Sequence, residues 1–221
     1  MVEGRRMSQE QLKLLRLFVP GVMLYILLIP PILDLTTLEE RWSTNLLRYS
    51  IPALIFGVIY DIVDARRLAW GGSVRQVNAN IKDKLLEPCC EDDEISAATE
   101  KLREGRVLLN VFYSLVDNDP SLQEKAKRVR FNGILWSSVA DLETVGVMGT
   151  IVYLVGYAVT GLRFELAMTI GLALISLVAH FVFVPRYTGR QIRLSNEQLE
   201  FIVQKDRAGL CKQIKGAALG R

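Results

Sequence analysis

Four long apolar stretches, divided into two pairs by a charged middle segment, restrict what this chain can fold into. Each is about 17–19 residues long, close to the ~20 residues that an α-helix needs to cross the ~30 Å hydrocarbon layer of a bilayer. Their centres are almost free of Asp, Glu, Lys and Arg, which are costly to place in lipid. We therefore predict an all-α, polytopic membrane protein with four transmembrane helices, at Leu17–Leu33, Leu46–Val63, Thr144–Leu162 and Leu166–Val184.

The basic residues predict how this protein is oriented. Of the 27 Lys and Arg residues, only Arg41, Arg48 and Arg163 belong to the predicted external loops and their borders. Basic residues beside transmembrane helices stay on the cytoplasmic side, so we expect both termini and the central segment in the cytoplasm. We accordingly expect a multi-pass protein of the cell (inner) membrane, with its first apolar stretch retained as a signal anchor.

The same pattern divides the chain into four parts. Residues 1–63 hold a short lead-in helix at 7–16 and the first two spans, which a brief external loop joins. Residues 64–142 form a cytoplasmic helical segment, residues 143–184 the last two spans, and residues 185–221 a cytoplasmic C-terminal helix. The cytoplasmic segment is too short for an ordinary enzyme domain.

Local signals predict the helices of the water-facing parts. Apolar residues recur at helical spacing over Ser73–Glu87 and over Glu94–Val116, and Gly71 and Gly72, just before the first of these ranges, predict a flexible joint. Asp119 suits the N-cap and Pro120 the first position of a third helix, which meets no breaker before the third span. We therefore expect one helix to run continuously from water into lipid. The capping-box sequence Ser195–Gln198 predicts the start of the C-terminal helix.

Charged residues gather at the predicted cytoplasmic ends of the second and third spans. One interpretation is an acidic vestibule that attracts cations. Carboxylates at one depth on two helices can also coordinate a divalent metal, which would allow a lipid-modifying enzyme that uses Asp61, Asp64 and Asp141. The interpretation that we favour is ion pairing between these carboxylates and nearby arginines. The charged cluster consists of Asp61, Asp64, Arg66, Arg67, Arg128, Arg130, Asp141 and Glu143.

The chain contains few residues that could carry enzyme chemistry. His180 is the only histidine, and it lies about 22 Å from Glu165 along one helix at ~1.5 Å per residue, so the two cannot act together. One histidine and three cysteines do not provide a credible zinc site. We predict no catalytic, cofactor-binding or metal site, and a packing or hydrogen-bonding role for His180. Cys89, Cys90 and Cys211 lie on the predicted cytoplasmic side, so we expect no disulfide.

Small residues in the last two spans predict close contact between helices. Small residues four positions apart let two helix backbones approach each other. The segment Gly161–Glu165 predicts a tight external turn between these spans. The spacing leaves open whether the contacts form within one chain or between copies. The packing positions are Gly146, Thr150, Gly156, Thr160, Ala167 and Gly171.

These features favour a non-enzymatic, oligomeric membrane protein. No span carries a charged residue at its centre, which argues against a coupled transporter. The leading hypothesis is a channel, pore or other membrane effector whose cytoplasmic helices bind a soluble protein or ligand that gates or recruits it. The alternative is a membrane scaffold or assembly factor that docks a soluble partner. Expected partners are the lipid bilayer, further copies of the chain and that cytoplasmic protein or ligand, with no cofactor and no nucleic acid.

Polar side chains within the spans are what distinguishes a pore from a scaffold. Four spans are few to enclose a pathway alone, so conduction requires a ring of subunits with polar side chains facing its centre. The polar positions available are too few and too scattered to decide between the two hypotheses. They are Ser50, Thr150, Tyr153, Tyr157, Thr169 and Ser176.

Overall fold

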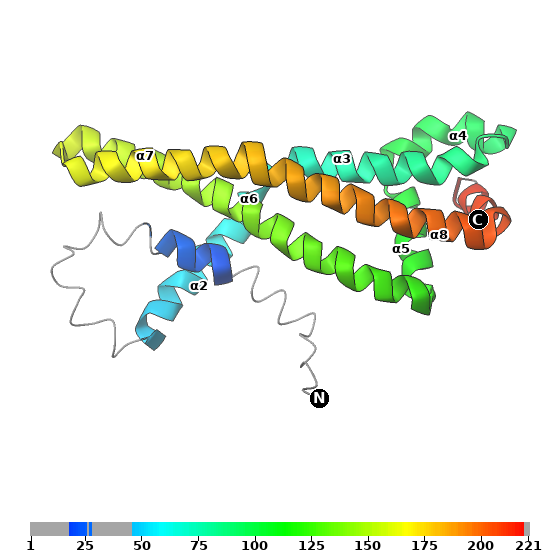
Figure 1. Ribbon diagram of the computed structural model, residues 1–221, viewed down its shortest axis with the longest axis horizontal. Helices are drawn as coiled ribbons and strands as arrows, with labels where there is room; N and C mark the ends of the chain where they lie inside the picture. Colours follow the sequence, from blue (N-terminus) through cyan, green and yellow to red (C-terminus); the bar gives the residue numbers. More distant parts are fainter. Residues whose placement is uncertain (1–17, 26, 28–45, 219–221) are drawn as a thin grey trace. The chain divides into compact units, whose positions relative to one another are not determined.

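The computed structural model describes residues 18–25, 27 and 46–218 (Figure 1). In this part of the chain the regular secondary structure is helical and no strand occurs, which confirms the all-α prediction. The lead-in helix at 7–16, the first external loop and about half of the first predicted span lie outside the described residues. The helices are α2 (Leu46–Ile62), α3 (Arg66–Leu86), η2 (Glu87–Cys89), α4 (Asp93–Glu104), α5 (Val107–Asn118), α6 (Pro120–Thr160), α7 (Arg163–Val178), η3 (Ala179–Phe183) and α8 (Val184–Ala218).

The chain divides into two compact units. The first unit consists of the described residues up to Gly71 together with Trp136–Val184. The second unit consists of Gly72–Leu135 together with the chain from Pro185 onward. The chain leaves each unit inside a helix, because α3, α6 and the run from α7 to α8 each contribute residues to both units. Figure 1 shows α6 as one unbroken ribbon.

Two helices are long and apolar enough to cross a membrane. They are α6 and the continuous run of α7, η3 and α8, and the third and fourth predicted spans lie within them. The apolar part of α2, Ala53–Ile62, is shorter. In the most apolar stretch of α6 only 33% of the residues are buried within the chain, and in that of the α7–α8 run only 28%. Most residues of both stretches are therefore not buried within the chain.

A glycine that the sequence analysis did not single out brings two helices of the first unit close together. Residues 18–25 are helical, and Gly21 lies against α2. A Cβ added at Gly21 would lie 2.7 Å from the backbone nitrogen of Gly57 and closer still to the carbonyl oxygen of Ala53. Both are backbone atoms, so they cannot rotate away. Only glycine permits this approach.

We expect Gly21→Ala to lower the free energy of unfolding by about 1–3 kcal/mol, because the added methyl group forces the two helices apart. Thermal unfolding of the purified protein in detergent, followed by circular dichroism, measures the change. Gly72→Ala is the matched control, because a Cβ at Gly72 in α3 meets no atom within 4 Å. If the two variants were equally stable, the close approach of residues 18–25 to α2 would be contradicted.

The predicted helix that begins at Pro120 is confirmed. α6 runs for 41 residues from Pro120 to Thr160 without a break. Asp119 caps it as expected, because its Oδ1 accepts hydrogen bonds from the backbone N–H groups of Ser121 at 2.8 Å and Leu122 at 3.2 Å. At the other end, Gly161 adopts a φ of +69° and begins the predicted tight turn into α7.

Two predicted helix boundaries are wrong, and both errors concern glycines. α3 begins at Arg66 rather than near Ser73, so Gly71 and its neighbour lie inside the helix instead of forming a joint. Contacts made by the first turn of α3 outweigh the low helix propensity of glycine. The helix predicted over Glu94–Val116 is divided into α4 and α5, because Gly105 takes an extended conformation with ψ of −178° and ends α4.

The prediction that the last helix starts at Ser195 is also wrong. α8 begins at Val184, and Ser195 is buried inside it. Pro185 does not end the helix, because the preceding residues form the π-helical turn η3. The wider turn leaves room for the proline ring, and it changes the backbone hydrogen-bonding pattern where proline has no N–H group to donate.

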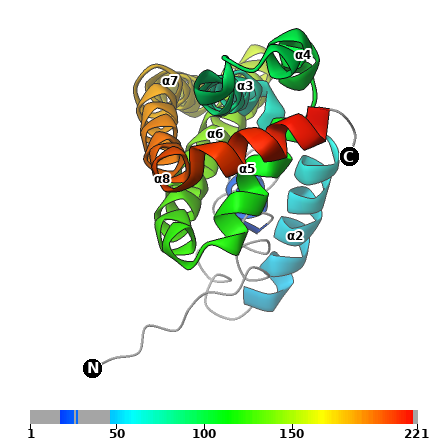
Figure 2. The same ribbon diagram turned by 90° about the vertical axis from the view of Figure 1, so that its right-hand side faces the viewer.

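The break in α8 occurs later, at Asp206. This residue has φ of −157° and ψ of 76°, which are not helical values. Its Oδ1 accepts a hydrogen bond from the backbone N–H of Gly209 at 2.7 Å, so Asp206 acts as the N-cap of the final helical segment. Figure 2 shows this segment, in red, turning away from the earlier part of α8, in orange.

Candidate functional site

The charged site of the first unit is centred on Asp141, which lies in α6 and is buried. Arg66, the first residue of α3, donates to both of its carboxylate oxygens, from Nε at 2.6 Å and from Nη2 at 3.0 Å. The hydroxyl of Tyr60, near the end of α2, donates to Oδ1 at 3.0 Å. The carboxylate therefore ties the turn between α2 and α3 to α6.

The local sequence explains why Arg66 reaches Asp141. α2 ends at Ile62, and Asp64 adopts a φ of +50°, a left-handed conformation that Asp tolerates better than most residues. This turn allows α3 to start at Arg66. Trp70, one helical turn later, lies with its ring 5.9 Å from the guanidinium carbon and packs edge-on against Trp136 at 5.0 Å. The aromatic side chains shield the ion pair from water.

The burial of this pair sets its electrostatics. The side chain of Asp141 is 3% exposed and that of Arg66 is 14% exposed. Burial by itself would lower the pKa of Arg66, but the hydrogen bond and the negative charge of Asp141 raise that pKa above its ordinary value. Arg66 therefore stays charged, and it requires the carboxylate of Asp141 because an unpaired charge is very unfavourable in a buried place.

A second buried carboxylate lies in the same unit. Oε1 of Glu143 is 2.9 Å from Nδ1 of His180, which belongs to the π-helical turn η3. This contact confirms the prediction that the lone histidine bonds to a neighbouring helix. Oε2 of Glu143 is buried and has no hydrogen-bond partner among the described residues. Ser176 is bonded to backbone carbonyls of Leu172 and Glu143 at 2.9 and 3.5 Å.

The other members of the predicted charged cluster do not join this site. Asp61 and Asp64 are exposed, and Asp64 lies 3.8 Å from Arg67, which is exposed too. Arg128 and Arg130 belong to the second unit, where Arg130 lies 3.6 Å from Asp117. Among the described residues, no group of three or more His, Cys, Asp or Glu is placed to hold a metal ion.

The predicted packing positions fall into two groups. Gly146 lies directly against Ser176, and a Cβ at Gly156 would lie 2.9 Å from a carboxylate oxygen of Glu165, so both glycines pack within the chain. Thr150 donates to the Gly146 carbonyl at 2.8 Å, and Thr160 donates to Glu165. The remaining two positions, in α7, face outward: Ala167 is exposed, and Gly171 meets nothing within 4 Å.

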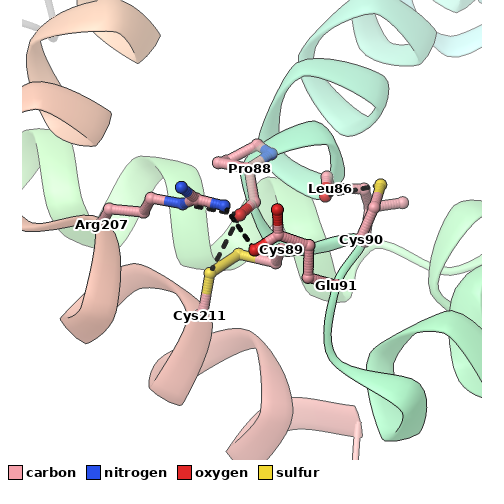
Figure 3. A network of polar contacts seen from close by, with 7 residues as sticks. All are labelled: Leu86, Pro88, Cys89, Cys90, Glu91, Arg207 and Cys211. Atoms are coloured by element: carbon pink, nitrogen blue, oxygen red, sulfur yellow. Dashed lines mark hydrogen bonds and ion pairs between the residues drawn. A yellow bond between two sulfur atoms is a disulfide. The ribbon is translucent and has the colours of Figure 1, made fainter.

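A disulfide in the second unit contradicts the sequence analysis. Cys89 in η2 is bonded to Cys211 in the last segment of α8, across 122 residues of sequence (Figure 3). The neighbouring Arg207 donates to the Pro88 carbonyl at 2.8 Å and lies 3.3 Å from Glu91. The prediction failed because the two cysteines are brought together by the tertiary fold and by no local pattern. Cys90 remains a free, exposed thiol.

Further ion pairs hold the end of α8 in place. Lys215 lies 3.2 Å from the carboxylates of both Asp92 and Glu94, at the start of α4. The hydrogen bond from Lys215 lowers the pKa of Asp92 below its ordinary value. We use the name C-terminal clasp for the contacts made by Arg207, Cys211 and Lys215.

Asp119 gives the second unit a pH-dependent contact. Its carboxylate accepts a hydrogen bond from Lys205 in α8, which lowers the pKa of Asp119 below its ordinary value of ~3.9. A lowered carboxyl pKa stabilises the fold above the unfolded-state pKa, and this stabilisation disappears as pH falls through the folded-state value. We expect Lys205→Met to destabilise the protein at neutral pH but not at pH values below the lowered pKa of Asp119. Urea unfolding at several pH values measures this.

Lys212→Met is the control for that experiment. Lys212 is exposed in the last segment of α8 and forms no ion pair with a described residue, so its replacement should leave stability unchanged at every pH. A constant difference between Lys205→Met and the unsubstituted protein from neutral to acid pH would contradict the assignment.

Comparison of the chain with protein-family models, with curated proteins and with solved structures finds no match.

Proposed function

We propose that this chain is a non-enzymatic, integral membrane protein whose second unit binds a cytoplasmic partner or ligand and whose apolar helices respond to that binding. The observation that carries the membrane part is the exposed apolar surface of α6 and α7. A helix of this composition in a soluble protein is mostly buried, whereas only 33% and 28% of the residues in these two stretches are buried within the chain. Large exposed side chains on them include Ile151, Leu154, Val155, Ile170 and Leu174.

The continuous helix α6 supports the proposal that the apolar helices respond to binding at the second unit. It belongs to the second unit up to Leu135 and to the first unit from Trp136 onward, with no loop between the two parts. A displacement of its N-terminal part is thus passed along hydrogen-bonded backbone rather than lost in a flexible linker. In this proposal all four predicted spans cross the cell membrane, with both termini and the second unit in the cytoplasm.

The outward-facing small residues of α7 support an oligomer. Ala167 and Gly171 are four residues apart; Ala167 is exposed, and a Cβ at Gly171 would meet no atom of the described residues within 4 Å. Small residues at this spacing allow a helix of a second copy to approach. An oligomer is also what a channel or pore of this size requires.

Substitutions at Gly133 in α6 test whether the apolar helices respond through this helix. Gly133 has open space around it and lies three residues before the first unit begins. The purified protein, reconstituted in vesicles filled with calcein, should release the dye or carry current in a planar bilayer. Gly133→Pro breaks the helix at this position and should abolish the activity, whereas Gly133→Ala keeps the helix and should preserve it. Absence of release and current from an intact oligomer would exclude the pore form of the proposal.

A membrane scaffold is the second candidate, and one observation favours it. The polar side chains that a pore lining would use bond within the chain: Tyr153 donates to the Leu27 carbonyl at 2.9 Å, and Thr169 donates to the Glu165 carbonyl at 2.8 Å. Both are buried. A scaffold predicts stable co-purification of a soluble partner, no conductance, and no effect of Gly133→Pro on partner binding.

A further inference from the structure

Three arginines near the start of α8 share one exposed face. Arg186, Arg190 and Arg193 are spaced by four and three residues, which places them on the same side of a helix. With Tyr187 and Gly189 they line an open hollow of about 430 Å³. None of the three forms an ion pair with a described residue. Their charges are therefore not balanced within this part of the chain.

The opposite face of α8 is packed, so the arginine face cannot turn inward. The amide nitrogen of Asn132 in α6 donates to the Tyr187 carbonyl at 3.3 Å and to the side-chain oxygen of Gln191 at 2.8 Å. Asn132, Thr188 and Ser195 are buried. These contacts lie within the second unit and fix the rotation of the helix about its axis.

Gly189 lies in the middle of the arginine face. A Cβ added there would meet no atom within 4 Å, so helix packing does not require a glycine. Glycine is unfavourable in a helix interior, and the turn here is ordinary helix with no break. Because glycine has no side chain, the helix surface beside the three arginines is left open.

We propose that this hollow binds a phosphate group. A guanidinium presents a planar pair of donors that matches phosphate oxygens, and no Asp or Glu occurs between Val184 and Asn196 to compete for it. The phosphate belongs either to a lipid headgroup or to a soluble phosphate compound. The proposal that the phosphate belongs to a lipid rests on the proposed function, because Arg186 follows the last predicted span by two residues. The proposal of a phosphate site does not rest on that function.

Binding of two probes to the full-length protein in neutral detergent tests the site. The probes are dioctanoyl phosphatidylglycerol and inorganic pyrophosphate, and isothermal titration calorimetry measures their affinities. We expect the triple variant R186Q/R190Q/R193Q to bind the better probe at least about tenfold more weakly. The control K101Q/R106Q/R128Q removes the same charge from exposed, unpaired positions of the same unit and should change the affinity less than about twofold.

Alanine at Gly189 provides a test that leaves the charge unchanged. Gly189→Ala should weaken binding severalfold, because its methyl group occupies the floor of the hollow, whereas Gly133→Ala, also in open helical surroundings, should not. Binding of the lipid without competition from pyrophosphate identifies a headgroup, and competition identifies a soluble phosphate. Equal losses in the two triple variants, or no binding of either probe, overturn the proposal. Sedimentation without detergent tests the membrane proposal separately.

Discussion

Asp141→Ala should lower the free energy of unfolding by about 3–5 kcal/mol, the range found when one partner of a buried ion pair is removed. The substitution leaves the Arg66 guanidinium buried without its carboxylate and leaves the Tyr60 hydroxyl without its acceptor. It also releases the turn between α2 and α3 from α6. Thermal unfolding of the purified protein in detergent, compared with that of the unsubstituted chain, measures the loss.

Two further variants distinguish this mechanism from a general effect of losing a carboxylate. Asp61→Ala removes an exposed carboxylate of the same predicted cluster, and its effect should stay within about 0.5 kcal/mol. The double replacement Arg66→Met with Asp141→Leu should recover most of the stability, because it removes both charges together. If the double variant were as unstable as Asp141→Ala, packing rather than the unpaired charge would explain the loss.

The sequence predicted the helices that rest on local signals. α6 was expected from its cap at Asp119 and from the absence of a breaker, and both features are local. The errors arose where tertiary contacts override local preference. Gly71 and its neighbour predict a flexible joint, yet α3 is helical at both positions, and the ion pair of Arg66 and the packing of Trp70 stabilise it there. Ser195 read as a cap, yet it is buried within α8.

The candidate site was predictable in composition but not in pairing. Asp141 and Arg66 were both in the predicted cluster, because charged residues at the ends of apolar helices stand out in a sequence. Tyr60, Trp70 and Trp136 were not in that cluster, because the sequence does not show which aromatic residues will contact an ion pair that is distant along the chain. The spacing of Arg66 and Trp70 by four residues was the available signal, since it places them on one helix face.

The disulfide and the basic residues predict different compartments for the second unit. Disulfides persist in oxidising compartments, whereas the distribution of Lys and Arg predicts that the second unit lies in the reducing cytoplasm. We expect the cytoplasmic assignment to hold, so that Cys89 and Cys211 are thiols in the cell and bond after purification in air. Lysis of the cells directly into denaturant that contains a thiol-blocking reagent, which exposes the otherwise buried Cys89, should then block all three cysteines. Protection of Cys89 and Cys211 would place the second unit outside.

Reduction of the purified protein should lower the free energy of unfolding by about 2–4 kcal/mol. The bond joins residues that are 122 positions apart, so it removes a large amount of conformational freedom from the unfolded chain. Urea unfolding with and without a phosphine reductant measures the change, and Cys211→Ser should reproduce it. Since the break at Asp206 separates the last segment of α8 from the rest, we expect that segment to exchange its amide hydrogens faster after reduction.

Cys90 provides the matched control for this experiment. Its thiol is exposed and only contacts the Leu86 carbonyl, at 3.2 Å, so Cys90→Ser should leave the stability of both the oxidised and the reduced protein unchanged. The ion pairs of Lys215 with Asp92 and Glu94 do not depend on the disulfide, so the C-terminal clasp should loosen rather than detach. Adding Lys215→Met to the reduced protein should therefore loosen the segment further, with Arg207 as the remaining member of the C-terminal clasp. If reduction changed neither stability nor exchange, the bond between Cys89 and Cys211 would contribute nothing to the fold, and the segment would be held by its ion pairs and by the buried Leu210 and Ile214.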